Sequence, residues 1–245
     1  MKKYRFFVNK NLLFDNNVYL FDNNYYKIRN ILKLRIGDIV FLFNNNIEVK
    51  SIIVKYGFNY VIVKKVEKKF FKNSNLSLNL GYFISKDSHM ELAIQKATEL
   101  GVFCIIPLIS ISRNKIINVY NLKNRMLHWK RIIIESCRQS NRISIPIICY
   151  PITLYKWINY LNYLKKSINI TNVILSSDLT NSIDYLKCSK YINIIIGSEN
   201  GITKNELLFL QFNGFKKICL GSRILRTETA VFSGITAFQL YVGDM

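Results

Sequence analysis

The sequence predicts an α/β protein in two parts: a small β-barrel, then a mostly parallel sheet covered by helices. Short runs rich in aromatic and β-branched residues fill roughly the first 70 positions. From residue 76 onward, apolar strands alternate with segments of helical spacing. The charged stretch KKVEKKFFK, Lys64–Lys72, predicts a linker, with a solvated strand end as the alternative. We therefore expect domains at 1–72 and 73–245.

The first part combines many short strands with a single helix, a pattern typical of a small barrel rather than of a βαβ unit. The helix is expected over Asn24–Lys33, from its helical spacing of apolar residues. Turn signals at Gly37-Asp38 and in the Asn44–Asn46 run separate the strands. The expected strands are Tyr4–Val8, Val18–Phe21, Asp38–Phe43, Ile47–Lys55 and Tyr60–Val66.

The second part alternates strands and helices, which favours a mostly parallel sheet with helices packed on it. The expected strands are Leu76–Ile84, Val102–Leu108, Val173–Leu175, Ile192–Ile196 and Phe215–Leu220. The expected helices are Ser88–Leu100, Leu122–Gln139, Leu154–Lys165, Thr203–Phe212 and Arg226–Tyr241.

Two of these helices begin with the pattern of a capping box, in which a hydroxyl and a glutamate satisfy free amides of the first turn. Ser88 and Glu91 form one such pattern, and Thr203 and Glu206 form the other. Gly101 follows the first of these helices and is expected to end it.

The composition favours a polyanionic partner. The formal net charge is +20, which indicates nucleic acid or an anionic membrane, although AT-rich coding would also enrich lysine. No basic amphipathic segment suits a membrane surface, and no apolar run approaches the roughly 20 residues of a membrane span. The N-terminus lacks the apolar core of a signal peptide, so we expect a cytoplasmic protein.

The five cysteines do not indicate a metal or redox site. They are odd in number and show no CxxC spacing, and only two histidines accompany them. We expect no metal, and interpret the cysteines as small buried hydrophobic residues.

Three strand ends carry unusual sequence. Ligands of open α/β sheets bind beyond the carboxyl ends of the strands, where small residues let the backbone approach a ligand closely. GxGxxG and P-loop patterns are both absent, and an ordinary turn remains the alternative at each strand end. The three segments are Leu175–Asp178, Gly197–Gly201 and Leu220–Arg223.

The chain resembles a known family at five segments in matching order and spacing. These are GYFISKDSHMELAIQKATELGV, PLISISR, RQSNR, IIIGSENGITKNE and LGSRILRTETA. They resemble the RsmE family, bacterial 16S rRNA uracil-N3 methyltransferases of the SPOUT superfamily. LGSRILRTETA is the most specific of them, and the resemblance covers essentially the whole chain.

The resemblance implies a PUA-like, RNA-binding β-barrel followed by a SPOUT methyltransferase domain with a C-terminal trefoil knot. It also implies a homodimer, S-adenosylmethionine as cofactor, and 16S rRNA of the small ribosomal subunit as partner. The cofactor would be held mostly by the backbone of the strand-end loops. The residues expected there are Leu175, Ser176, Ile196, Gly197, Ser198, Gly201, Leu220, Gly221, Ile224, Leu225, Thr227 and Thr229.

Methyl transfer to a uracil N3 needs in-line positioning and a destination for the imide proton. A carboxylate could accept the proton, or an arginine could stabilise the negative charge that develops on the flanking oxygens. Our candidates are Arg226 and Glu228, with Glu199 third. The alternative role for Glu228 is a helix N-terminal carboxylate that interacts with the helix dipole.

Arginines within the matching segments are the expected RNA contacts, because the planar guanidinium binds phosphate with several donors. A solvated surface charge is the alternative for each of them. They are Arg5, Arg35, Arg113, Arg138, Arg142 and Arg223.

The chain departs from the family pattern in its cofactor loops. GPEGG appears as GSENG, with Ser198 and Asn200, and LGPR appears as LGSR, with Ser222. Asn200 is expected to keep a left-handed turn that the family makes with glycine. Two rival functions remain open: a SPOUT methyltransferase with another RNA target, such as a ribose 2′-hydroxyl, and a non-catalytic RNA-binding or ribosome-assembly protein.

Overall fold

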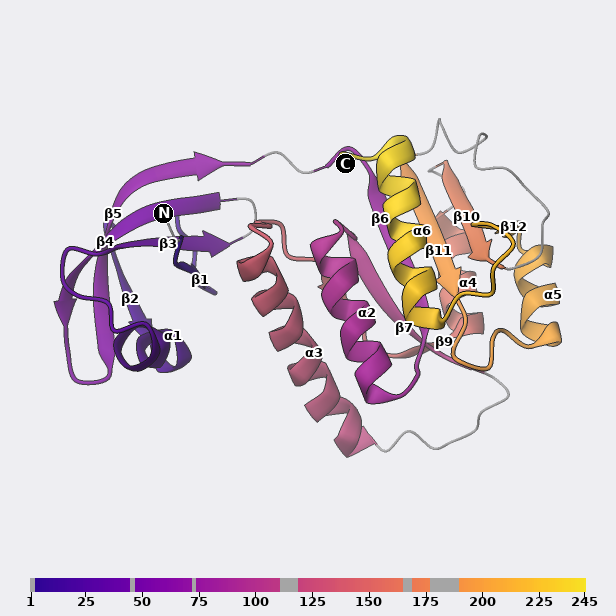
Figure 1. Ribbon diagram of the computed structural model, residues 1–245, viewed down its shortest axis with the longest axis horizontal. Helices are drawn as coiled ribbons and strands as arrows, with labels where there is room; N and C mark the ends of the chain where they lie inside the picture. Colours follow the sequence, from indigo (N-terminus) through magenta and orange to yellow (C-terminus); the bar gives the residue numbers. More distant parts are fainter. Residues whose placement is uncertain (1–2, 45–46, 72–73, 111–118, 165–168, 177–189) are drawn as a thin grey trace. The chain divides into compact units, whose positions relative to one another are not determined.

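A computed structural model describes residues 3–44, 47–71, 74–110, 119–164, 169–176 and 190–245 (Figure 1). The chain forms two compact units. The first comprises residues 1–73 and 137–145, and the second comprises residues 74–136 and 146–245. These units differ from the expected domains because residues 137–145 group with the first one.

The first unit is a five-stranded sheet with strand order β1-β3-β4-β5-β2, in which only the β1–β3 pair is parallel. Its core lies on one side, where the buried residues include Phe6, Leu20, Ile28, Leu42 and Val61. The strands are β1 (Arg5–Phe7), β2 (Asn17–Phe21), β3 (Ile39–Asn44), β4 (Ile47–Tyr56) and β5 (Tyr60–Phe70).

Two expectations for this unit need correction. The expected helix begins earlier, as α1 (Asp22–Tyr26), and continues as the π-helical turn η1 (Lys27–Ile31). The expected linker Lys64–Lys72 is mostly strand, since β5 continues to Phe70. The charged residues from Lys64 to Lys69 lie on this strand, which pairs with β4 with a register shift at Lys50/Ser51, so the solvated strand end was the better interpretation.

The second unit is a parallel sheet with strand order β12-β10-β11-β6-β7-β8, and β9 also pairs with β7. Strand β11 is buried on both faces, which explains why it is apolar from Ile192 to Ile196 except at Asn193. The strands are β6 (Ser77–Phe83), β7 (Cys104–Ile109), β8 (Ile147–Ile148), β9 (Ile152–Thr153), β10 (Ile170–Leu175), β11 (Tyr191–Ile196) and β12 (Lys216–Ile218).

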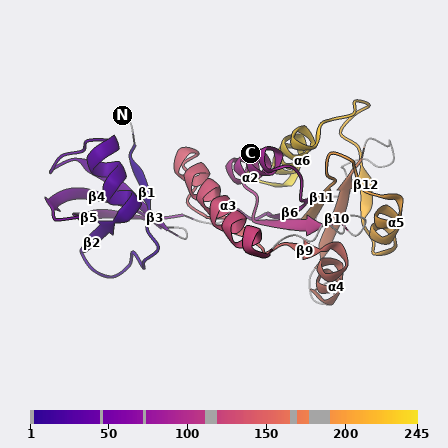
Figure 2. The ribbon, with the colours of Figure 1, turned by 90° about the horizontal axis from the view of Figure 1, so that it is seen from below.

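Helices cover both faces of this sheet. Helices α2 and α6 lie side by side on one face (Figures 1 and 2). Helices α4 and α5 pack on the other, where Trp157, Ile158 and Leu210 share a core with Ile174 and Ile195. The helices are α2 (Asp87–Glu99), α3 (Val119–Gln139), α4 (Leu154–Leu164), α5 (Lys204–Phe212) and α6 (Thr227–Val242).

A ladder of buried amides fixes the register of three central strands. Asn79 on β6 donates to Asn193 on β11 at 2.8 Å, and Asn193 donates to Asn172 on β10 at 2.7 Å. A one-residue slip would separate these amides and leave polar groups unpaired in the core. The register sets where each strand ends, and therefore where the strand-end loops meet.

One of the two predicted capping boxes exists. Thr203 accepts a hydrogen bond from the Glu206 backbone N–H, and the Glu206 side chain accepts one from the Thr203 N–H. The prediction of a capping box at Ser88 and Glu91 is wrong. Helix α2 begins at Asp87, and its N-cap residue Lys86 makes no side-chain capping hydrogen bond. Among the described residues, no helix combines the length and apolarity needed to cross a membrane.

Candidate active site

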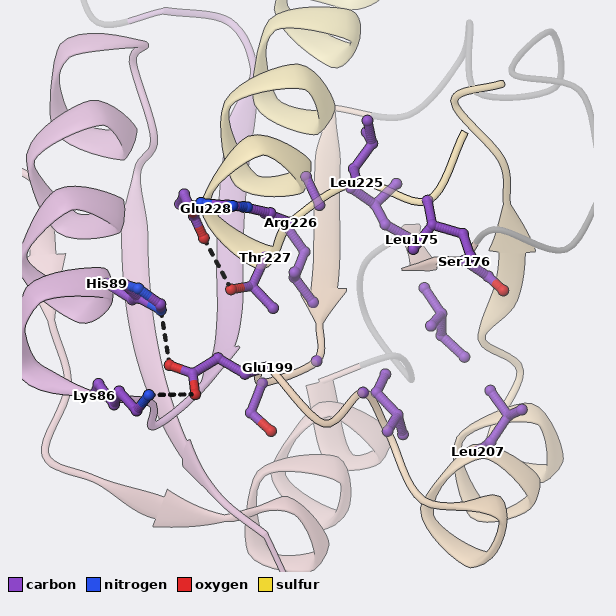
Figure 3. A pocket seen from close by; sticks show the side chains of 18 residues that line it. Lys86, His89, Leu175, Ser176, Glu199, Leu207, Leu225, Arg226, Thr227 and Glu228 are labelled. Carbon is purple, nitrogen blue, oxygen red and sulfur yellow. Dashed lines mark hydrogen bonds and ion pairs between the residues drawn. The ribbon is translucent and has the colours of Figure 1, made fainter. Parts of the chain in front are cut away.

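The carboxyl ends of four adjacent parallel strands meet at one edge of the second sheet. Strands β10, β11 and β6 end at Leu175, Ile196 and Phe83, and β12 ends at Ile218. The residues after these ends, with the turn before α6, line a cavity of about 630 Å³ (Figure 3). That volume lies in the range of small-molecule sites.

Most of the residues predicted for catalysis and cofactor binding line this cavity. They are Leu175, Ser176, Ile196, Gly197, Ser198, Glu199, Gly201, Ile224, Leu225, Arg226, Thr227 and Glu228. Leu220 and Gly221 line an adjoining cavity of about 120 Å³, together with Arg223. Thr229 lines neither cavity, whereas its neighbours Glu228 and Ala230 both line the larger one.

The loop after β11 folds back on itself. The Gly201 N–H donates to the Ser198 carbonyl at 2.7 Å, and Gly201 has a φ of +72°. A Cβ on Gly197 would lie 2.8 Å from the Gly201 carbonyl carbon, so only glycine fits there. The expectation that Asn200 takes the left-handed conformation is wrong, because this conformation falls on Gly201.

Glu199 is held by Lys86 and His89, which lie at the N-cap and in the first turn of α2. Its carboxylate lies 2.7 Å from His89 Nδ1 and 3.7 Å from Lys86 Nζ, and its side chain is 30% exposed (Figure 3). The sequence analysis did not assign Lys86 or His89 to the site. The signal was present, since both residues closely follow a strand end, that of β6.

The turn into α6 supplies the remaining polar groups. Arg226 is the exposed N-cap residue of α6, and Thr227 and Glu228 form its first turn. The Thr227 hydroxyl donates to the Glu228 carboxylate at 3.2 Å. This position suits both interpretations of Glu228, as a reacting group at the cavity and as a carboxylate at the positive end of a helix.

The predicted RNA-binding arginines have different surroundings. Arg35 and Arg223 are exposed, and Arg138 and Arg142 are partly exposed in the segment that groups with the first unit. Arg113 lies outside the described residues. The expectation for Arg5 is corrected, because its side chain is 1% exposed.

The donors of Arg5 are already used within the first unit. Its Nε donates to Glu48 at 2.8 Å, and its terminal nitrogens donate to the carbonyls of Cys137, Arg138 and Arg142 at 2.6, 3.3 and 3.1 Å. The ring of Phe43 covers the guanidinium at 4.3 Å. Arg5 therefore joins β1 to the 137–145 segment and is not accessible to a phosphate.

Comparison with known proteins places this architecture in a class. An RNA methyltransferase domain family model matches residues 72–239. The ribosomal RNA small subunit methyltransferase E of Buchnera aphidicola subsp. Acyrthosiphon pisum is 37% identical, with 89% of this chain and 85% of that protein aligned. The protein of the same name from Rickettsia conorii is 33% identical, with 87% and 85% aligned.

A solved structure extends the likeness to the whole fold. The ribosomal RNA small subunit methyltransferase E of Neisseria gonorrhoeae, bound to S-adenosyl methionine, is 27% identical and superposes with a TM-score of 0.88 over 100% of both chains. The expected fold class, a SPOUT-type α/β domain preceded by a small barrel, is confirmed. The expected knot depends on the connection from β10 to β11, of which residues 177–189 lie outside the described part.

The fold and the strand-end site thus define an RNA methyltransferase of the SPOUT class. Within this class, the chain belongs to the RsmE family, the ribosomal RNA small subunit methyltransferases E.

Proposed function

We propose that the chain methylates N3 of a uridine in 16S rRNA of the small ribosomal subunit, with S-adenosylmethionine as donor. The observation that carries this proposal is the cavity built from the strand-end loops in a chain of this family. The N3 position rests on the resemblance of LGSRILRTETA to the family sequence. A ribosomal substrate would place the protein in the cytoplasm.

The residues present fit S-adenosylmethionine. The backbone at Gly197 lies so close to the backbone at Gly201 that a side chain on Gly197 has no room. Main-chain groups of both glycines therefore line the cavity. Ile174, Leu175, Ile202 and Leu225 supply an apolar lining. We therefore assign the cofactor to the 175–176, 197–201 and 224–227 segments, where it would supply an electrophilic methyl group.

Glu199 has the most defined geometry of the three catalytic candidates. Lys86 and His89 hold its carboxylate at the cavity, so it can accept a proton without first being reoriented. Arg226 is exposed beside the cavity and can stabilise negative charge on a uracil oxygen. Glu228 already accepts a hydrogen bond from Thr227, which suits a carboxylate that stabilises the helix start.

Exposed apolar residues support the proposed homodimer. Ile224 is 89% exposed in the turn before α6, and Leu240 is 66% exposed near the end of this helix. Val231, Ile235 and Phe238 instead point into the chain's own core. The apolar residues of this segment therefore divide between the core and the surface, with exposed ones at both ends.

The proposal is tested by incubating unmodified small ribosomal subunits with the protein and isotope-labelled cofactor. Mass spectrometry of the digested RNA should show N3-methyluridine at one position. A methylated ribose, or another methylated base, would instead identify a SPOUT enzyme with a different target. No cofactor binding by calorimetry, together with retained RNA binding, would favour a non-catalytic assembly protein.

Two matched substitutions distinguish the roles of the Glu199 and Glu228 carboxylates. Glu199→Gln should lower the rate of methyl transfer about a hundredfold, the usual effect of losing a general base, while cofactor affinity changes little. Glu228→Gln should lower the rate much less and should mainly reduce stability, by roughly 0.5 kcal/mol. Single-turnover kinetics and calorimetry measure both effects. The reverse order of rates would assign the proton acceptor to Glu228.

A further inference from the structure

Three aromatic rings gather on the outer face of the β2–β5 pair in the first unit. Along β2, Val18 and Leu20 are buried, whereas Tyr19 and Phe21 are each 46% exposed. The core lies on the inner face, so it does not account for these rings. Clustered exposed aromatic residues on a soluble protein commonly mark a binding surface.

The strand register brings the rings together. Phe21 pairs with Tyr60 and Tyr19 pairs with Ile62, and directly paired residues of antiparallel strands share one face. The ring centroid of Tyr60 lies 5.7 Å from that of Tyr19 and 5.8 Å from that of Phe21. Tyr19 and Phe21 lie 6.3 Å apart with their planes 13° from parallel. We call Tyr19, Phe21 and Tyr60 the aromatic face.

A glycine maintains this arrangement. A Cβ on Gly57 would lie 2.2 Å from Cζ of the Tyr60 ring, so the ring packs directly on the bare backbone of the β4–β5 turn. The Gly57 N–H also donates to the Tyr60 carbonyl at 2.9 Å. The position of Tyr60 is therefore built into the hairpin.

Positive charge surrounds the aromatic face. Lys10 Nζ lies 5.9 Å from the centroid of the Phe21 ring. Lys64 is exposed and pairs with Asn17, which places it on the same face as Tyr19. Further along β5, Lys68 and Lys69 are also exposed, and the exposed acidic residues in these two segments are Glu67 on β5 and Asp22 directly after Phe21. A ligand that carries both flat rings and negative charge would complement these aromatic rings and lysines.

We propose that the aromatic face binds unpaired nucleotides of RNA by stacking their bases, with Lys10 and Lys64 contacting phosphates. Aromatic side chains on an open sheet, flanked by cations, are the common chemistry of single-stranded RNA recognition. This inference rests on the proposed function in that RNA is the substrate. It adds a second contact region, in the unit that does not contain the strand-end cavity.

The test uses the full-length chain and a single-stranded RNA of about 12 nucleotides carrying the fluorescent base 2-aminopurine. Binding should change the fluorescence of the reporter base, because stacking alters its emission. Tyr19→Ala and Phe21→Ala should each weaken binding about tenfold and reduce the change in emission. Phe21→Tyr keeps a ring and should bind nearly as wild type.

Phe212→Ala is the matched control. Phe212 on α5 is 91% exposed but lies in the other unit, so its loss should leave RNA affinity unchanged. Lys10→Gln should weaken binding and reduce its salt dependence while retaining the emission change. Thermal unfolding of each variant establishes that the fold is intact, and Phe21→Tyr keeps the comparison valid if an alanine variant unfolds.

Several outcomes would overturn the inference. One is wild-type affinity in both folded alanine variants, and another is no binding of the single strand by the wild-type chain. Unchanged RNA affinity with lost binding to ribosomal subunits would indicate a protein partner instead. Calorimetry with S-adenosylmethionine and the methylation assay are run in parallel. A failure of methylation with ring-dependent RNA binding intact would count against the proposed function alone.

Discussion

Arg5 shows how burial changes the meaning of a charged residue. Arg5→Met removes the guanidinium but leaves Glu48 buried, and Lys3 at 2.5 Å is then its remaining ion-pair partner among the residues that the structure describes. Breaking such a pair from one side costs about 3–5 kcal/mol. We expect a loss of that size in the free energy of unfolding, measured by urea denaturation.

Arg35→Met is the control for this prediction. Arg35 is exposed, so its replacement should change stability by less than about 0.5 kcal/mol. If Arg5→Met were as stable as wild type but bound RNA less tightly, direct RNA contact by Arg5 would have to be reconsidered.

Cys149 has a thiol unlike an ordinary buried cysteine. The Sγ atoms of Cys104 and Cys149 lie 3.6 Å apart, and the hydrogen bond from Cys104 lowers the pKa of Cys149 to about 7, against the opposing effect of burial. Burial raises the pKa of Cys137 to about 11. Because the thiolate is the reactive form, alkylation of Cys149 should rise as the pH passes 7, whereas Cys137 should stay unmodified.

Peptide mass spectrometry after brief iodoacetamide treatment at several pH values measures this difference. Cys104→Ala removes the donor, so the midpoint of the Cys149 profile should move to higher pH. Identical pH profiles for Cys137 and Cys149 would contradict the prediction. The sequence analysis treated both as small hydrophobic residues, because nothing in their spacing places Cys104 beside Cys149.

The two predicted capping boxes provide a test at the level of the element. Thr203→Ala should reduce the free energy of unfolding of the second unit by about 1 kcal/mol, since it leaves an amide of α5 without its acceptor. Ser88→Ala should change it by less than about 0.5 kcal/mol, because Ser88 lies inside α2 and caps nothing. Urea denaturation of both variants measures the two losses of stability. Equal losses would contradict the conclusion that only Thr203 caps its helix.

The elements themselves could largely be predicted, because their signals are local. Enrichment in aromatic and β-branched residues identifies β2 through β5, and the segment Ile192–Ile196, apolar except at Asn193, identifies β11 to within a residue. The start of α2 was misplaced because Ser88 and Asp87 are both plausible first-turn residues. The short strands β8 and β9 were missed, since two residues carry no periodicity.

The net charge of +20 has a consequence for the whole molecule. RNA binding should weaken about a hundredfold between 50 and 200 mM salt, because several phosphate contacts release counterions. Cofactor affinity should change much less over the same range, since the proposed cofactor contacts are mostly the backbone and apolar groups of the strand-end loops. Filter binding and calorimetry across a salt series check both. An RNA affinity that does not change with salt would mean that the lysine surplus reflects AT-rich coding and not phosphate binding.

The site was predictable in outline because strand ends of a parallel sheet meet at one edge. That rule identified the loops at Leu175, Gly197 and Leu220, and Glu199 and Arg226 came with them. Lys86 and His89 follow the end of β6 and fit the same rule, but their contact with Glu199, more than a hundred residues away along the chain, appears only in the folded structure. Thr229 is not among the residues that line the cavity, although Glu228 and Ala230 on either side of it are.

The sequence by itself determined the fold class, most of the elements and the family, because hydrophobic periodicity and sequence motifs depend on residues that are close together in the chain. Only the tertiary structure decided which charges are buried and which side chains meet. Arg5 is enclosed by the 137–145 segment, Glu199 is held by the start of α2, and Tyr60 joins Tyr19 and Phe21 through strand pairing. Contacts of this kind depend on packing between distant segments, which no local pattern encodes.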